Sequence, residues 1–344
     1  MGSTDRLRAR LRRGWRLRRG PWWLWLSVGL AVAVGLAAWR TSPPTAGGRP
    51  TATTQVSPVT AVPATTPPRS PWDSVAGAGR SSRLGRWVLR DRFLVLAELA
   101  DQGLATVSRH GKPTDIVFRG ELSVPETLRK QGWVHVGDPD SWHGYIFDAY
   151  QADPGAGEKL FVVTSPNGTV HRFVHHLAPG EEYNNSFAAI SPDGQWMVSG
   201  EWGQMSRLLV FATPLINPAS AGLEKDLPIT TTINLDYPVR NVQGCTFVSP
   251  LEILCATDDP GRDLWPTPDQ LLSLTLPHPL DGRPVTAHVT SLGQLPLMSA
   301  CQGAYEVEGI DYQPSTSTLR VEVKPPGQCG LSIAVYEYRS TATH

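Results

Sequence analysis

The stretch Phe187-Ala-Ala-Ile-Ser-Pro-Asp-Gly-Gln-Trp-Met-Val-Ser-Gly-Glu201 decides the fold class of this chain. An apolar run ends at Ile190, the turn Ser191-Pro-Asp-Gly194 follows, and a second alternating run begins at Trp196. Apolar runs of strand length on either side of a Pro-Asp-Gly turn predict a β-hairpin. A third strand is expected at Arg207–Phe211 after a short loop.

A hairpin followed closely by a third strand resembles a blade of a β-propeller, the repeat architecture of WD-repeat and quinoprotein-like domains. Similar units recur about every 45–60 residues along the chain. The resemblance implies an all-β propeller over residues 81–340, with about five blades and six as the alternative. A β-sandwich is the rival architecture.

The sequence predicts five units of short strands. The first has Arg92–Leu99 and Thr114–Phe118, with a helical turn within Leu122–Lys130; the second has Trp133–Val136, Tyr145–Tyr150, Leu160–Thr164 and Val170–Val174. The third has the hairpin, Arg207–Phe211 and Ile229–Leu235; the fourth has Gly244–Val248, Ile253–Thr257, Leu271–Leu276 and Val285–Val289. The fifth has only Tyr305–Tyr312, Leu319–Val323 and Leu331–Tyr336. The resemblance therefore implies that an N-terminal strand, Arg86–Leu89, closes the ring.

The four cysteines test this arrangement. Cys245 and Cys255 lie symmetrically about Pro250, so they should face each other across a hairpin within disulfide reach. In a propeller, the loop before a blade meets the loop between its second and third strands, which places Cys301 near Cys329. We predict the disulfides Cys245–Cys255 and Cys301–Cys329, against the alternative of free buried thiols.

The N-terminus indicates a cellular address. Residues 1–20 form a basic tail, and residues 21–39 carry no charge and have Trp22, Trp25 and Trp39 near their ends. This pattern predicts a single transmembrane signal-anchor helix with a cytoplasmic N-terminus and an extracytoplasmic C-terminal domain in a bacterial cell membrane. Secretion after cleavage near Gly35-Leu36-Ala37 is the alternative. Residues 40–80, rich in Pro, Thr and Ala, predict a disordered linker.

Charge is unevenly distributed along the chain. Residues 1–40 hold nine Arg and one Asp, and the remaining 22 basic and 30 acidic residues give the rest of the chain a net charge of −8. An acidic domain lacks the positive field that attracts phosphate backbones, which argues against nucleic acid as a partner. The expected partners are the membrane, through residues 21–39, and a protein or envelope glycan.

The propeller resemblance implies a ligand-binding rim in the loops around the first strands. Its candidate residues are Glu181, Glu182, Tyr183, Asn184, Asn185, Glu201, Trp202, Arg240 and Trp265. Hard cations such as Ca²⁺ need several oxygen ligands. The candidate metal ligands are Asp138, Asp140, Asp258, Asp259 and Glu308. The alternative is that these Asp-Pro and Asp-Gly motifs only form turns.

Glu308-Gly309-Ile310 resembles the Glu-Gly-Ile/Pro element of gluconolactonase-type and phytase-like propellers, in which the Glu can bind metal. Alternatively, Gly309 simply eases packing where backbones crowd together. The chain has no Gly-x-Ser-x-Gly, His-Glu-x-x-His or phosphate-binding Gly loop, and no catalytic residue is identified. We expect a membrane-anchored binding or scaffold module without other cofactors. The alternative is an exported metal-dependent propeller hydrolase or lactonase, since propellers host both.

Overall fold

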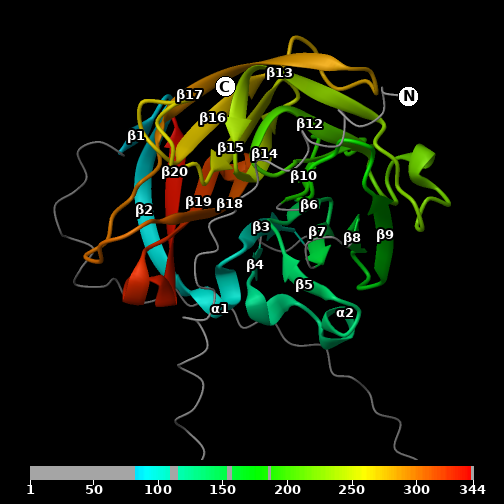
Figure 1. Cartoon of the computed structure of the whole chain (residues 1–344), viewed down its shortest axis with the longest axis horizontal. Helices are drawn as coiled ribbons and strands as arrows, with labels where there is room; N and C mark the ends of the chain where they lie inside the picture. Colours follow the sequence, from blue (N-terminus) through cyan, green and yellow to red (C-terminus); the bar gives the residue numbers. More distant parts are fainter. Residues whose placement is uncertain (1–81, 109–114, 153–156, 185–186, 342–344) are drawn as a thin grey trace, which may run out of the picture. The chain divides into compact units, whose positions relative to one another are not determined.

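The computed structural model describes residues 82–108, 115–152, 157–184 and 187–341 (Figure 1). All of them belong to one compact unit within residues 64–344. The predicted basic tail, anchor helix and linker (residues 1–20, 21–39 and 40–80) lie outside the described residues. Within the described ranges, no helix has both the length and the apolar character that a membrane span requires.

The N-terminal and C-terminal strands of the described chain share one antiparallel sheet of five strands. Its order is β1-β2-β20-β19-β18, with β1 (Arg83–Leu84), β2 (Trp87–Leu96), β18 (Glu306–Gln313), β19 (Thr318–Lys324) and β20 (Ser332–Ser340). The strand expected at Arg86–Leu89 is therefore longer than predicted and pairs along β20, from Trp87↔Ser340 to Leu96↔Ser332. The first and last segments of the domain are thus held together by a backbone ladder.

Two further sheets are formed by residues 103–176. A two-stranded sheet has β3 (Gly103–Val107) and β4 (Asp115–Arg119). A five-stranded sheet has β5 (Trp133–Val136), β6 (Asp140–Trp142), β7 (Tyr145–Ala152), β8 (Glu158–Thr164) and β9 (Val170–His176). β5 and β6 pair with successive parts of β7, and Asp138 lies in the break between them.

The third and fourth predicted units do not form separate sheets. Their strands join in one eight-stranded sheet in the order β10-β11-β12-β13-β17-β16-β15-β14. The bounds are β10 (Ala189–Ile190), β11 (Trp196–Ser199), β12 (Gln204–Ala212), β13 (Thr231–Arg240), β14 (Val242–Ser249), β15 (Glu252–Thr257), β16 (Gln270–Thr275) and β17 (Val285–Gln294). The two middle strands, β13 and β17, pair in parallel, and the edge strands β10 and β14 lie beside each other, so the sheet is nearly closed and barrel-like.

Helices are few and short, so the described chain is all-β. They are α1 (Ala97–Ala100), α2 (Glu126–Arg129) and the 3₁₀ turns η3 (Glu121–Ser123), η4 (Pro218–Ser220), η5 (Pro314–Thr316) and η6 (Gly327–Leu331). α2 confirms the helical turn expected within Leu122–Lys130.

The two strands of the first predicted unit lie in different sheets. Residues 92–96 belong to β2 and pair with β20, whereas residues 97–100 are helical. The partner of β4 is instead β3, whose Gly103-Leu-Ala-Thr-Val107 was not predicted to be a strand. β2 pairs with β20 at nine positions, more than the five-residue β4 could offer.

The hydrophobic core fills the spaces between neighbouring sheets. Phe161 of β8 packs against Phe211 of β12 with ring centroids 5.4 Å apart, joining two sheets. Leu254 of β15 shares another cluster with Val321 and Tyr336 of the terminal sheet. Because each fully buried large apolar side chain contributes about 1.5–3 kcal/mol, these face-to-face contacts supply most of the attraction between the sheets.

Both predicted disulfides are confirmed. Cys245 and Cys255 are direct partners across the β14–β15 ladder, with Cα atoms 4.1 Å apart. Cys301 bonds to Cys329, which lies in η6, and their Cα atoms are 6.0 Å apart. The second bridge joins two loops on either side of the β18–β19 hairpin and closes a longer loop than the first.

Five strands surround the middle of the domain and contact one another in a closed series: β3, β6, β10, β14, β18 and back to β3 (Figure 1). The backbone comes closest at Asp138. A Cβ on Gly103 of β3, Gly244 of β14 or Gly309 of β18 would overlap the Asp138 carboxylate. Glycine is therefore required at these points because three backbones approach one buried side chain.

We predict that Gly309→Ala lowers the free energy of unfolding by about 3 kcal/mol, because the added methyl has no room. It would meet the Gly103 Cα at 2.5 Å as well as Asp138. Urea unfolding followed by tryptophan fluorescence measures the change. Gly222→Ala is the control: its φ is +78° and no atom lies within 4 Å of the added Cβ, so only the left-handed conformation costs about 1 kcal/mol. Equal losses in the two variants would contradict the crowding at Asp138.

Candidate functional site

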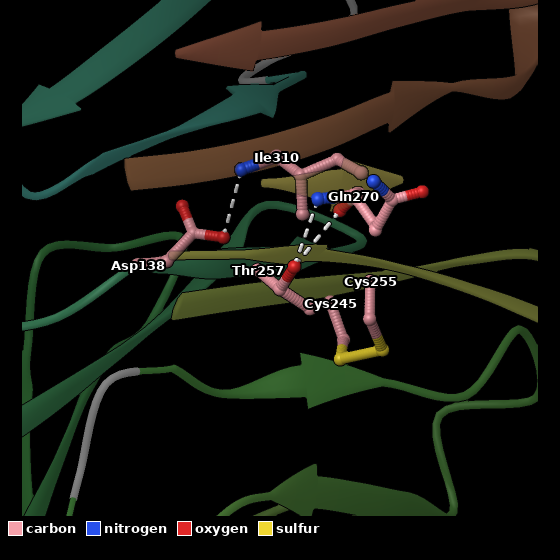
Figure 2. Close-up of a disulfide and its surroundings, with 6 residues drawn as sticks. All are labelled: Asp138, Cys245, Cys255, Thr257, Gln270 and Ile310. Atoms are coloured by element: carbon pink, nitrogen blue, oxygen red, sulfur yellow. Dashed lines mark hydrogen bonds between the residues drawn. A yellow bond between two sulfur atoms is a disulfide. The ribbon is translucent and has the colours of Figure 1, made fainter. Parts of the chain in front are cut away.

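Asp138 is the buried centre of the candidate site, with 1% of its surface exposed. Its Oδ1 accepts a hydrogen bond from the Leu104 amide at 3.1 Å. Its Oδ2 accepts one from the Ile310 amide at 3.0 Å (Figure 2). Its backbone carbonyl also accepts the Ala188 amide at 3.1 Å. One residue thus binds β3, β18 and the segment leading into β10.

A β-bulge places two more carboxylates beside Asp138. In the β18–β19 ladder, Val307 pairs with Val323 and Ile310 pairs with Val321, so Glu308 and Gly309 together oppose Glu322. Two residues against one is the definition of a bulge, a device that re-aims side chains near functional sites. We call Asp138, Glu308 and Glu322 the central acidic cluster.

Glu322 is the least satisfied member of this cluster. It is 0% exposed, and neither of its carboxylate oxygens accepts a hydrogen bond of regular geometry. The Gly309 amide and the carboxylates of Asp138 and Glu308 act on it electrostatically. A fully buried carboxylate without a partner costs several kcal/mol if it is charged.

The central acidic cluster continues toward solvent. Glu308 is partly buried, and Glu306 beside it has a side chain that is 55% exposed. Lys324 places its Nζ 2.5 Å from Glu306 Oε2 and 3.9 Å from Asp101 Oδ2. Lys324 therefore offsets part of the negative charge, while Glu322 and Asp138 lie beneath it without a cation of their own among the described contacts.

Burial raises the pKa of all three carboxyls of the central acidic cluster well above the ordinary range. At Asp138 the amides of Ile310 and Leu104 oppose this rise in pKa. At Glu322 the neighbouring Asp138 and Glu308 carboxylates add to it. All three groups therefore hold protons more tightly than exposed carboxyls do.

A second acidic region lies directly beside the first. The Val307 amide donates to Asp258 Oδ1 at 3.4 Å, and burial raises the pKa of Asp258 to about 6. Burial likewise raises the pKa of Asp269 to about 7, with Asp258 and Asp259 adding to the effect. Asp259 is 2% exposed and binds Arg240 Nη1 through Oδ1 at 3.1 Å.

Three aromatic side chains lie around Arg240 at the surface. Trp202 is 46% exposed and Tyr237 39% exposed, and the ring of Tyr237 lies 4.9 Å from the partly buried Trp265 ring. The backbone beside Trp202 is held to the residue after Arg240, because the Asn241 amide donates to the Gly203 carbonyl at 3.1 Å. We call Trp202, Tyr237 and Trp265 the aromatic surface.

Arg240 holds this surface in place. Its Nη2 lies 2.6 Å from Asp263 Oδ2 and donates to Gln204 Oε1 at 3.2 Å. The guanidinium lowers the pKa of Asp263 to about 2 through these hydrogen bonds. Paired with two aspartates in a bidentate geometry, Arg240 serves to anchor the β12, β13 and β15–β16 loops.

The other predicted rim residues mainly stabilise the fold. Glu181 is buried, with Lys159 Nζ 2.7 Å from its Oε1 and His175 Nε2 2.9 Å from its Oε2. Burial opposes ionisation of Glu181, but His175 and Lys159 overcome it and lower its pKa to about 2. His175 Nδ1 also lies 2.8 Å from the Leu227 carbonyl, so the ring is held between Glu181 and the backbone.

Glu201 does not join the central acidic cluster. It is 5% exposed and binds Arg207 through two hydrogen bonds of 2.6 and 2.8 Å. The Glu182 amide and the Asn184 side chain also donate to Glu201. The Tyr183 hydroxyl binds the Ala152 backbone, and Asn185 lies outside the described residues.

The five predicted metal ligands are only partly brought together. Asp138 and Glu308 share the central acidic cluster and Asp258 lies next to it, but Asp140 accepts the amides of Ser141 and Ile190, and Asp259 pairs with Arg240. Nowhere in the described ranges do three His, Cys, Asp or Glu side chains have an arrangement that could hold a metal ion.

Glu322, Lys324 and Tyr237 were not identified from the sequence. Arg320-Val-Glu-Val-Lys324 alternates charged and apolar residues, a pattern typical of a strand with one face in solvent. In the structure β3 covers that face, because Arg320 Nη1 donates to Thr106 Oγ1 at 2.8 Å. The alternating pattern of Arg320–Lys324 predicts a strand, but it does not predict that Glu322 is buried.

We predict that Glu322→Gln stabilises the protein at pH 8 by about 2 kcal/mol and has little effect near pH 4. A carboxyl whose pKa is raised in the folded state favours folding below its unfolded pKa of 4.5, and this advantage is lost as pH rises. Urea unfolding at both pH values measures the difference. Glu126→Gln, at an exposed position on α2, is the control and should change stability by less than about 0.5 kcal/mol. A destabilised Glu322→Gln at pH 8 would contradict an unpaired buried carboxylate.

The comparison with known proteins adds no family to this picture. Neither a protein-family model nor a curated protein matches the chain.

Proposed function

We propose that the protein is a membrane-anchored, extracytoplasmic binding module that contacts a protein partner through the aromatic surface. The observation that carries this proposal is the exposure of Trp202 and Tyr237 beside an arginine fixed by two aspartates. Trp, Tyr and Arg are the residues that most often dominate the binding energy of protein interfaces. Soluble proteins gain nothing in stability from leaving such large aromatic side chains exposed.

The finer architecture that we propose is a five-bladed propeller. Two features support it: the closed series of contacts among β3, β6, β10, β14 and β18, and the pairing of N-terminal β2 with C-terminal β20. In this arrangement β3 and β4 form a reduced blade, and the parallel contact between β13 and β17 links two neighbouring blades at their outer edges.

The extracytoplasmic location is also a proposal. Two disulfides among the described residues support an oxidising compartment, because disulfides form and persist there. The apolar segment at residues 21–39 supplies the anchor in this proposal.

We predict that a photo-crosslinking amino acid at position 202 of the full-length chain, expressed in its native cell, captures a discrete protein partner. The same amino acid at Val170, which is 57% exposed on β9, is the matched control and should capture none. Trp265→Ala should reduce the position-202 adduct at least about tenfold, since losing an aromatic anchor typically costs 2 kcal/mol or more.

Immunoblotting of the adducts before and after protease digestion reads out this experiment. An adduct that resists protease but is removed by glycan hydrolases would identify an envelope glycan and overturn the protein-partner proposal. Equal capture at positions 202 and 170 would show that the aromatic surface is not the binding site.

A further inference from the structure

The region between the aromatic surface and the central acidic cluster has more carboxyl groups than basic side chains. Asp258, Glu306 and Glu308 lie there, each at least partly accessible, above the buried Glu322 and Asp138. Lys324 is bound to Glu306, lies near Asp101 and also interacts electrostatically with Glu308. A single lysine cannot neutralise this many carboxylates.

The two regions are physically continuous. Arg240 of the aromatic surface binds Asp259, the next residue along the chain is Asp258, and Asp258 accepts the Val307 amide between Glu306 and Glu308. Asp258 and Asp259 therefore connect the aromatic surface to Glu306 and Glu308.

Glu322 is a second, independent sign of a missing ligand. It is fully buried, neither of its oxygens accepts a hydrogen bond of regular geometry, and only the Gly309 amide opposes the effect of the neighbouring Glu308 and Asp138 carboxyls on it. Buried polar groups in native proteins are normally satisfied, so an orphaned carboxylate beside accessible acids points to a cationic group that is supplied from outside.

We propose that the protein partner presents a basic segment, and that one of its ammonium or guanidinium groups binds over the central acidic cluster at Glu308. This inference rests on the proposed function and names the chemistry of the partner. The remaining basic side chains of the segment face Glu306 and Asp258, and its apolar residues contact the aromatic surface.

An organic cation fits this geometry better than a metal ion does. Metal ions such as Ca²⁺ need several oxygens gathered at about 2.3–2.6 Å, and the described carboxylates do not gather in this way. Ammonium and guanidinium groups donate several hydrogen bonds in different directions. They can therefore bind carboxylates that are spread apart. Lys324 already binds Glu306 in this manner, and a lysine or arginine of the partner would repeat it at Glu308.

The test is isothermal titration of the full-length chain, in an uncharged detergent at pH 8 and low salt, with a hexalysine peptide. The basic residues 1–20 repel this probe, so they do not mimic the site. We expect saturable binding that Glu308→Gln and Glu306→Gln each weaken at least about fivefold, the loss of one exposed to partly buried charge contact. Glu126→Gln on α2, which removes an equal charge elsewhere, should leave the affinity unchanged.

Parallel titrations separate the alternatives. Spermidine that binds while hexalysine does not would assign the site to small polyamines and overturn the proposal. Calcium chloride that binds stoichiometrically and displaces hexalysine would assign it to a metal ion and overturn it as well. Hexalysine affinity that is equal in Glu308→Gln, Glu306→Gln and the unsubstituted protein would show that the cluster is not the site.

The inference and the proposed function fail in different ways. If hexalysine does not bind but position 202 still crosslinks to a protein, only the proposal of a basic segment is contradicted. If hexalysine binds but position 202 gives no adduct, the proposed role of the aromatic surface is contradicted and the acidic cluster remains as the binding site. Glu306 has a 55% exposed side chain, so Glu306→Gln keeps the test valid even if Glu308→Gln disturbs the bulge.

Discussion

The buried carboxylate of Asp138 is the interaction on which the described structure depends. It accepts amides from β3 and β18, while its own carbonyl accepts the amide before β10. Three glycines, Gly103, Gly244 and Gly309, let their strands approach it closely. Burying a carboxylate costs several kcal/mol, and hydrogen bonds to a charged or strongly polar acceptor return about 1.5–3 kcal/mol each. Asp138 offsets the cost of its burial because it accepts hydrogen bonds from several strands at once. These hydrogen bonds hold the strands together at this point.

This convergence concentrates negative charge. The same bulge that lets Gly309 pass Asp138 sets Glu308 and Glu322 against each other, so the feature that closes the centre of the fold also creates an unsatisfied acidic cluster. Elsewhere among the predicted rim residues, ionisable groups form ion pairs within the protein, such as Glu201–Arg207. Those pairs fix the loops and leave the aromatic side chains as the exposed contact groups. The bulge at Glu308–Gly309 therefore contributes both to the packing around Asp138 and to the proposed binding site.

Local chemistry was predictable from the sequence, and long-range convergence was not. The Ser191–Gly194 turn and the symmetry of Cys245 and Cys255 about Pro250 have consequences within one hairpin, and the structure confirms them. The pairing of β2 with β20 was anticipated only in outline, because two adjacent apolar runs form one strand when a long partner is available. Glu322 was missed because its burial depends on a sheet more than 200 residues away in sequence, at β3.

The most direct test of the central role of Asp138 is the free energy of unfolding of Asp138→Asn. Asparagine keeps the shape, but its NH₂ group would face a backbone N–H of either Leu104 or Ile310, so one buried amide loses its acceptor. The account predicts a loss of about 1–3 kcal/mol with an unchanged near-ultraviolet circular dichroism spectrum. A variant as stable as the unsubstituted protein, or more stable, would contradict the claim that this carboxylate holds the sheets together.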